Sequence, residues 1–375
     1  MGMNKDILLI ITPELGTGGG CVYYRISLIA NYINANPAFN TKVIVSCVPL
    51  FDPELLLRTK AVLVQRPMST MPFIKNYREL APKYSYKLLG EVDDLWTTWH
   101  GMALPDYHPN FIQKRDYEVI DKVTAENLSY MDAMIVSTDE LKRVLNVKYN
   151  FWNVYVLPNA APRGLFNSAR KDFFRDKPVC IIPSGKQHYS EPFQISPQFP
   201  AGKVGMRGDY TGKWVDWIND KVSKDEIDLT EMAGTAYFFD RNREKIQTTT
   251  WLDGYNYIGF LNRTKPDIVF APLANNPFTW CKSYLKFVEC CAMGSILMGS
   301  YFEKSPYEII HPYCRVPDNP SYEQMETVFK NVREHWKEIV DWQYDFINRN
   351  GLWIESEEHV ARFLTACGSL NRTLI

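Results

Sequence analysis

The sequence contains no apolar run near the roughly 20 residues that a membrane-spanning helix needs, and no signal-peptide pattern precedes its first apolar segment. It also lacks an excess of charge, since 42 basic and 43 acidic side chains leave a net charge of −1. No overall basic field therefore indicates a nucleic-acid or membrane partner, although a local basic groove stays open. We expect a cytoplasmic protein without a membrane span.

Metal and disulfide patterns are missing too. The eight cysteines show no Cys-x-x-Cys spacing, and the six histidines are dispersed. Most of the cysteines lie in apolar segments, which is typical of buried free thiols in a reducing compartment. We therefore expect no metal site and no disulfide framework.

Neither common nucleotide motif is present. Gly-x4-Gly-Lys-Ser/Thr does not occur, which disfavours a P-loop nucleotide hydrolase. The glycine-rich turn at residues 16–21 follows the first apolar run, but Cys21 stands where a dinucleotide fingerprint has its third glycine. The turn is either merely flexible or a place where backbone N–H groups approach a phosphate. On the second interpretation, the residues that contact phosphate or acceptor are Gly18, Gly19, Gly20, Tyr24 and Arg25.

What the chain does have is a regular alternation of short apolar runs with helical patterns, which predicts parallel strands joined by crossover helices. The expected strands are 7–11, 43–46, 61–65, 87–92, 134–137 and 154–157, followed by 179–183, 236–239, 255–260, 268–273, 296–298 and 314–316. A length of 375 residues with 46% hydrophobic residues suits two α/β domains. Residues 158–164 interrupt the pattern, so we place the boundary after residue 165.

Two adjacent carboxylates, Asp93 and Asp94, follow the expected strand 87–92. Consecutive strand side chains point to opposite sides, so one carboxylate is expected to face a cleft at the carboxyl edge of the sheet. There it can act as a general base or bind sugar hydroxyls, whereas the alternative is a surface loop or helix cap. His100, a few residues later, is a further catalytic candidate.

The first expected strand of the second half, 179–183, is followed by Ser184, Lys186 and His188. A hydroxyl, a cation and an imidazole at this position suit the edge of a nucleotide-phosphate site. A lone histidine is more often structural, and that alternative stays open for His188.

The most informative segment predicts a parallel β-α-β unit with a polar loop and a helix that begins at Lys282. On that helix Lys282, Lys286 and Glu289 share one face, and the N–H groups of its first turn, with Ser283, attract anions. Glu289 can accept hydrogen bonds from ribose hydroxyls. A solvated helix face is the alternative, but the apolar neighbours predict a largely buried helix whose charges need partners.

In this order the motifs resemble the glycosyltransferases of the GT-B fold, specifically the large retaining family 4-like group (glycosyltransferase family 1 domain) that uses nucleotide-sugar donors. The resemblance covers most of the chain. Its landmarks are the glycine-rich turn and the segments 136–141, 156–159 and 270–289. Three further segments, 20–25, 91–96 and 184–188, are similar to the phage-encoded branch of that family.

The resemblance implies two Rossmann-like domains facing across a cleft. Residues 1–165 would form the acceptor domain, residues 166–350 the donor domain, and residues 351–375 a C-terminal helix that packs back on the N-terminal domain. The family often has a second glutamate eight residues before the one that binds ribose, and here that position is Cys281.

The resemblance also implies roles for the site residues. Glu289 would bind the donor ribose, and Lys282 with Ser283 would contact the diphosphate or the sugar. Lys186 and His188 would line the other wall.

The expected activity is a metal-independent hexosyl- or pentosyltransfer, with a UDP-linked sugar as co-substrate and no further cofactor. The expected acceptor is a 5-hydroxymethylated pyrimidine in phage DNA, in the cytoplasm of the host. Three alternatives stay open: a cell-surface glycan, lipid or protein acceptor, a non-catalytic binding protein of the same fold, and a sugar-nucleotide epimerase.

Overall fold

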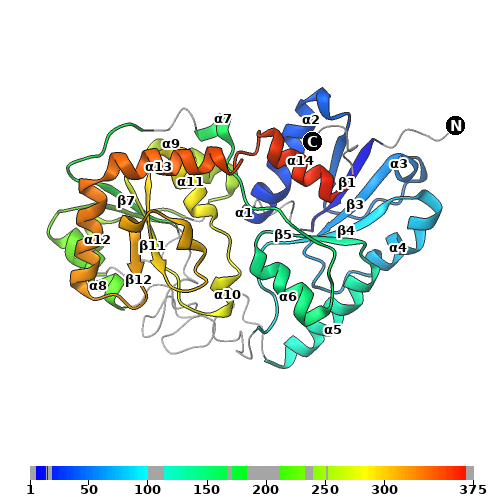
Figure 1. Cartoon of the computed structure of the whole chain (residues 1–375), viewed down its shortest axis with the longest axis horizontal. Coiled ribbons are helices and arrows are strands. Elements are labelled where there is room, and N and C mark those ends of the chain that lie inside the picture. The colour runs from blue at the N-terminus through cyan, green and yellow to red at the C-terminus, as the bar shows by residue number, and fades with distance from the viewer. Residues whose placement is uncertain are drawn as a thin grey trace.

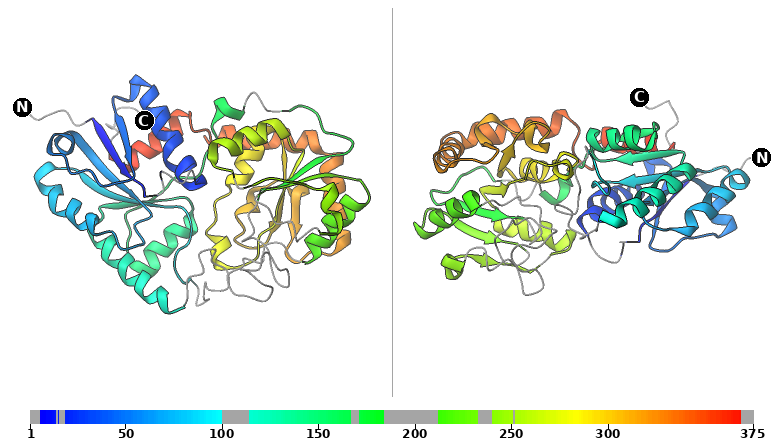
Figure 2. Two further views of the ribbon diagram at one scale, coloured as in Figure 1. Left: turned by 180° about the vertical axis from the view of Figure 1, so that it is seen from behind. Right: turned by 90° about the horizontal axis from the view of Figure 1, so that it is seen from below.

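The computed structural model describes residues 6–13, 15, 19–99, 114–166, 171–183, 212–232, 240–250 and 252–368. These residues form two lobes, each built on a twisted parallel sheet (Figure 1). Two further views show the same two lobes side by side (Figure 2). We call them the N-terminal half and the C-terminal half.

The sheet of the N-terminal half has six strands in the order β2-β1-β3-β4-β5-β6, and every pair is parallel. The strands are β1 (Ile7–Ile11), β2 (Lys42–Ser46), β3 (Thr59–Gln65), β4 (Lys87–Val92), β5 (Ala133–Val136) and β6 (Val154–Val156). Alternate residues enter different cores, because side chains of a strand point to opposite faces. Leu8 and Ile10 face one layer of helices, whereas Leu9 and Ile11 face the other.

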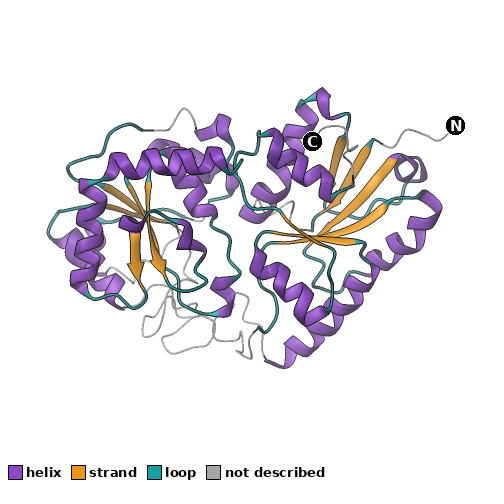
Figure 3. Cartoon of the chain, in the orientation of Figure 1, coloured by secondary structure: helices purple, strands orange, loops and turns teal. Residues whose placement is uncertain are grey.

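The C-terminal half repeats this plan in the order β12-β11-β10-β7-β8-β9, again with parallel pairs throughout. The strands are β7 (Val179–Ile182), β8 (Asp228–Glu231), β9 (Gln247–Thr248), β10 (Ile268–Ala271), β11 (Ile296–Tyr301) and β12 (Arg315–Pro317). Both halves therefore have the doubly wound α/β arrangement, with helices covering the two faces of each sheet (Figure 3).

Two helices of the N-terminal half begin at a side-chain cap that the sequence supplies. Asp52 and Thr138 each accept a hydrogen bond from a first-turn N–H group, at the starts of α3 and α6. The helical segments are α1 (Gly20–Val22), the π-helical turn η2 (Tyr23–Ser27), α2 (Leu28–Ala35), η3 (Pro37–Phe39), α3 (Pro53–Arg58), α4 (Pro72–Tyr84), α5 (Lys114–Tyr130) and α6 (Asp139–Tyr149). The short helix α7 (Arg163–Phe166) follows them, and its Phe166 enters the core of the C-terminal half.

The helices of the C-terminal half include two that begin with full capping boxes, at Asn276 and Ser321. They are α8 (Gly212–Ser223), η6 (Asp240–Lys245), α9 (Gly254–Thr264), α10 (Pro277–Trp280), α11 (Leu285–Met293), η7 (Pro306–Ile309), η8 (Pro312–Cys314), α12 (Tyr322–Glu334) and α13 (Trp336–Arg349). Among the described residues, no helix is both long and apolar enough to span a membrane.

The last helix, α14 (Glu357–Ala366), returns to the N-terminal half. Val360 and Phe363 enter the same core as Leu8 and Ile10 of β1, and Figure 1 shows α14 beside α2. The domain limits at residues 165 and 350 stay predictions.

The two halves also exchange buried side chains. Tyr23 and Tyr24 of the N-terminal half belong to the core of the C-terminal half. In return, Phe278 and Cys281 of the C-terminal half belong to a core of the N-terminal half. The interface between the halves is therefore packed like a protein interior.

Two expectations about secondary structure were wrong. Residues 255–260, expected as a strand, lie within α9, which begins after the cap Asp253. The helix expected to begin at Lys282 begins at Leu285, because α10 and a short turn precede it. The expected strand 236–239 lies outside the described residues, and β8 was not expected.

Candidate functional site

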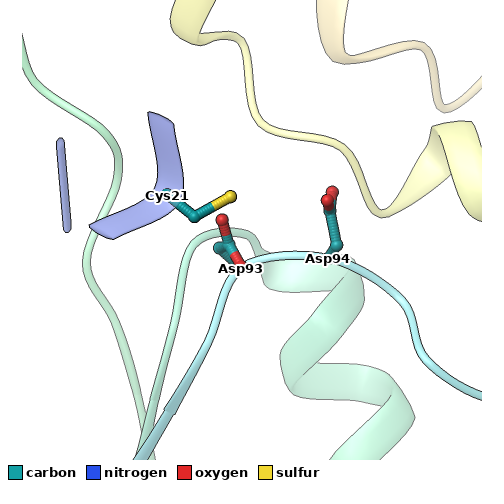
Figure 4. A group of neighbouring side chains, drawn as sticks. All are labelled: Cys21, Asp93 and Asp94. Atoms are coloured by element: carbon teal, nitrogen blue, oxygen red, sulfur yellow. The ribbon is translucent and has the colours of Figure 1, made fainter. Parts of the chain in front are cut away.

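The predicted carboxylates follow β4, and Asp94 faces the C-terminal half whereas Asp93 lies within the N-terminal half. Figure 4 shows Asp93 beside Cys21 and Asp94 one residue further along the loop. Asp93 is buried and accepts hydrogen bonds from Arg66, at 3.2 Å from Nε and 3.0 Å from Nη2. Arg66 has φ +52°, an uncommon backbone conformation for a side chain of its size. The residue after β3 thus holds the residue after β4 in place.

Ligand atoms of Cys21, Asp93 and Asp94 lie within 4.8 Å of one another, which raises the question of a cation site. A thiol must lose its proton to bind a metal. Burial, with the neighbouring Asp93 charge, instead raises the pKa of Cys21 well above its usual value. Arg66 Nη2 already lies 2.9 Å from the Cys21 sulfur. In this structure the Arg66 guanidinium thus supplies positive charge to both Cys21 and Asp93.

Asp94 makes an ion pair across the two halves. Lys282 Nζ lies 2.8 Å from Asp94 Oδ1, and both side chains are half-buried. The same ammonium lies 4.8 Å from the centre of the Phe278 ring, within range of a cation–π contact. Lys282 therefore points toward the predicted catalytic loop of the N-terminal half.

Glu289, on α11, is buried between two tyrosines. The Tyr24 hydroxyl donates to Oε1 at 2.5 Å from the N-terminal half, and the Tyr257 hydroxyl donates to Oε2 at 3.0 Å from α9. Burial raises the pKa of Glu289 to about 7, although both hydrogen bonds and the charge of Lys286 act in the opposite direction.

Ser283 contacts the segment that connects the halves. Asn159 Nδ2 donates to Ser283 Oγ at 2.7 Å. Arg25 Nη1 donates to Asn159 Oδ1 at 3.2 Å, and Arg25 Nε lies 2.7 Å from Glu91 Oε1. Arg25 and Glu91 are both buried, and burial raises the pKa of Glu91 despite the neighbouring guanidinium. Arg25, predicted to contact phosphate or acceptor, instead faces the interior and positions Asn159.

Gly19 and Gly20, at the start of α1, are not required there by a left-handed backbone conformation. Gly19 has φ −59°, which any residue adopts. A Cβ added to Gly20 would meet nothing within 4 Å, so Gly20 itself borders open space. That openness is compatible with the approach of a ligand to the backbone. Five predicted site residues lie outside the described part of the chain: Gly18, His100, Ser184, Lys186 and His188.

Lys282 and Ser283 lie before α11 rather than in its first turn, and Lys286 is half-buried one turn before Glu289. The sequence analysis missed three residues that contact this set: Arg66, Asn159 and Tyr257. Arg66 and Asn159 follow β3 and β6 at the carboxyl edge of the sheet, where ligand-binding residues gather. Tyr257 was hidden by the wrong assignment of 255–260 as a strand.

Two parallel sheets of this topology, with the last helix returning to the first half, define the GT-B fold. No protein-family model matches the chain, and no curated protein sequence matches it either. Solved structures do, and among them are GT-B glycosyltransferases.

The chain is similar to the crystal structure of Anabaena Alr3699/HepE in complex with UDP-glucose, with a TM-score of 0.55 and 11% identity. That match covers 96% of this chain and 99% of the other. It is also similar to the crystal structure of TarM, with a TM-score of 0.54 and 11% identity over 83% of this chain. The matched part spans 55% of the TarM chain, about half its length. At this identity the likeness establishes the fold.

Proposed function

We propose that the protein is a glycosyltransferase that moves a sugar from a nucleotide-sugar, UDP-linked in our proposal, to an acceptor hydroxyl. The observation that carries this proposal is the convergence of Lys282, Ser283 and Glu289 on one boundary, opposite Asp94. Cations, a hydroxyl and a carboxylate at the carboxyl edges of facing α/β sheets suit a nucleoside diphosphate.

The donor side of the reaction follows from the charges. Glu289 accepts hydrogen bonds from ribose hydroxyls, the same kind of donor that Tyr24 and Tyr257 present to it in this structure. Lys282 and Ser283 bind the diphosphate, and Lys286 adds positive charge near the start of α11. These groups stabilise the negative charge that develops on the departing diphosphate.

The acceptor side is assigned to the loop after β4. Asp94 is half-buried and reaches the boundary, so it can take a proton from an acceptor hydroxyl. Asp93 is buried and bound to Arg66, and its role is to fix the loop. Holding donor and acceptor on different halves aligns the hydroxyl with the anomeric carbon.

Cys281 stands where the resembling family often has a second glutamate. It is fully buried in a core of the N-terminal half, and burial raises the pKa of its thiol. Its position therefore suits packing between the halves. Other residues must select the sugar and set the stereochemistry of transfer.

For the acceptor we propose a 5-hydroxymethylated pyrimidine in phage DNA. The support is the resemblance of segments 20–25 and 91–96 to the phage-encoded branch. An enzyme that acts on such a base flips it out of the duplex. Within these segments Arg25 and Glu91 pair with each other in the interior, so contact with DNA must come from other side chains.

The test is release of nucleoside diphosphate from a panel of nucleotide-sugars, with duplex DNA containing 5-hydroxymethylcytosine and with the unmodified duplex as control. Release that needs the modified duplex supports both donor and acceptor. Slow release without DNA supports the transferase and rejects the DNA acceptor. No release from any donor by folded protein rejects the transferase and favours a binding protein of this fold.

A further inference from the structure

Three side chains that the proposed function assigns to the donor each have a partner from outside the C-terminal half. Glu289 accepts from Tyr24, Lys282 pairs with Asp94, and Ser283 accepts from Asn159. Tyr24 and Asp94 belong to the N-terminal half, and Asn159 lies in the connection after β6.

The partners match the donor chemically at two of the three positions. Asp94 presents a carboxylate to Lys282, as a diphosphate would present an anionic oxygen. Tyr24 presents a hydroxyl to Glu289, as a ribose would. A nucleotide-sugar and the N-terminal half can therefore both bind the Glu289 carboxylate and the Lys282 ammonium.

We propose that Tyr24 and Asp94 compete with the nucleotide-sugar for Glu289 and Lys282, so that donor binding exchanges contacts between the two halves. This inference rests on the proposed function. The contacts between the two halves then oppose donor binding, so they contribute to the donor affinity. Asp94 becomes available to the acceptor only when the diphosphate binds Lys282.

The backbone at Tyr24 supports this role. Tyr24 lies in the π-helical turn η2, and π-turns in α-helices are frequent at functional sites. The turn buries Tyr23, Tyr24 and Arg25 together. Tyr23 packs so tightly on α9 that a Cβ on Gly254 would lie 2.4 Å from its ring. The turn thus aligns Tyr24 with Glu289 while the two halves are packed as in this structure.

If Tyr24 were only a positioning residue, its removal would change nucleotide affinity in the opposite direction. If Tyr24 only orients Glu289 for ribose, loss of its hydroxyl weakens nucleotide binding. If it competes, the same loss strengthens binding. Tyr257 is the matched control, because it donates to the other oxygen of Glu289 from within the C-terminal half.

The experiment is calorimetric titration of UDP into the full-length wild type, Tyr24→Phe and Tyr257→Phe, with thermal unfolding to confirm that each variant folds. Removal of one competing hydrogen bond is expected to tighten UDP binding by about two- to tenfold in Tyr24→Phe. Tyr257→Phe is expected to leave it unchanged or weaker. Unchanged or weaker binding in Tyr24→Phe overturns the inference.

A second pair of variants keeps the test independent of Tyr24. Asp94→Asn frees Lys282, whereas Asp93→Asn removes the same charge one residue away while Lys282 keeps its partner. UDP binding is expected to tighten more in Asp94→Asn than in Asp93→Asn, and equal effects overturn the exchange at Lys282. Failure of every protein, wild type included, to bind any nucleoside diphosphate removes the proposed function and the inference with it.

Discussion

The Glu289 side chain lies in an environment that differs strongly from that of an ordinary surface carboxylate. It is 3% exposed, it receives two tyrosine hydroxyls, and its pKa is raised to about 7 by burial. The protonated form is therefore favoured in the folded protein at mildly acid pH. The carboxylate that the donor requires predominates only above neutrality.

This pKa gives the folded protein a dependence on pH. Between pH 4.5 and about 7 the folded state holds a proton on Glu289 that the unfolded state has lost, so stability falls as pH rises through this window. We expect the wild type to lose about 3 kcal/mol more than Glu289→Gln across that range, from roughly 1.4 kcal/mol per pKa unit. Denaturant unfolding at pH 4.5, 6 and 7.5 measures the free energy of unfolding of the two proteins. Parallel curves for the two proteins would contradict the assignment.

The cluster of Cys21, Asp93 and Asp94 gives a second prediction for single residues. Arg66 and Lys282 already supply positive charge to these ligand atoms. We therefore expect nucleoside diphosphate release to be unchanged by EDTA. A loss of release that Mg²⁺ or Mn²⁺ restores in the wild type, but not in Asp94→Asn, would show that the carboxylates bind a metal.

At the scale of elements, the start of α9 shows how packing decides what a sequence pattern leaves open. Residues 255–260 are an apolar run of strand length, yet Asp253 caps a helix there and Gly254 accommodates the ring of Tyr23. Local capping and a contact from the other half together outweigh the strand-like pattern. The same limit applies at Lys282, where the capping box at Asn276 makes a separate short helix, α10.

Two glycines of α9 give a matched pair of variants. Gly254→Ala places a Cβ 2.4 Å from the Tyr23 ring, and neither group moves cheaply, so we expect a loss of about 1–3 kcal/mol of stability. Gly259→Ala meets only Arg263 Nη1 at 3.5 Å, and it should gain about 0.5–1 kcal/mol from helix propensity. Chemical denaturation compares them. Equal effects would mean that the contact of Tyr23 with α9 is loose.

At the scale of the whole molecule, the sequence predicts the two α/β units but not the contacts between them. Alternating apolar runs and turns were enough to predict two α/β units and the segments that carry Asp94, Ser283 and Glu289. The pairings Tyr24–Glu289 and Asn159–Ser283 join residues more than 120 positions apart, and no local pattern contains them. Such contacts depend on how the halves pack, which is a property of the folded chain.

The exchanged side chains predict that the two halves unfold together. Phe278 of α10 is buried in a core of the N-terminal half. We expect Phe278→Ala to cost about 3–5 kcal/mol and to split a single unfolding transition into two. Phe173→Ala, which truncates an exposed ring, is the control. Two separate transitions in the wild type would contradict the coupling, and circular dichroism and tryptophan fluorescence that still coincide in Phe278→Ala would contradict the role of Phe278 in it.

The central claim is that Lys282, Ser283 and Glu289 bind a nucleotide-sugar at the boundary between the halves. The measurement that tests it most directly is release of nucleoside diphosphate from UDP-linked sugars by the wild type, Glu289→Gln and the exposed control Lys330→Gln. We predict release by the wild type and the control, and a kcat/KM lower by about ten- to hundredfold in folded Glu289→Gln. No release from any donor, or equal release by Glu289→Gln, would contradict the account.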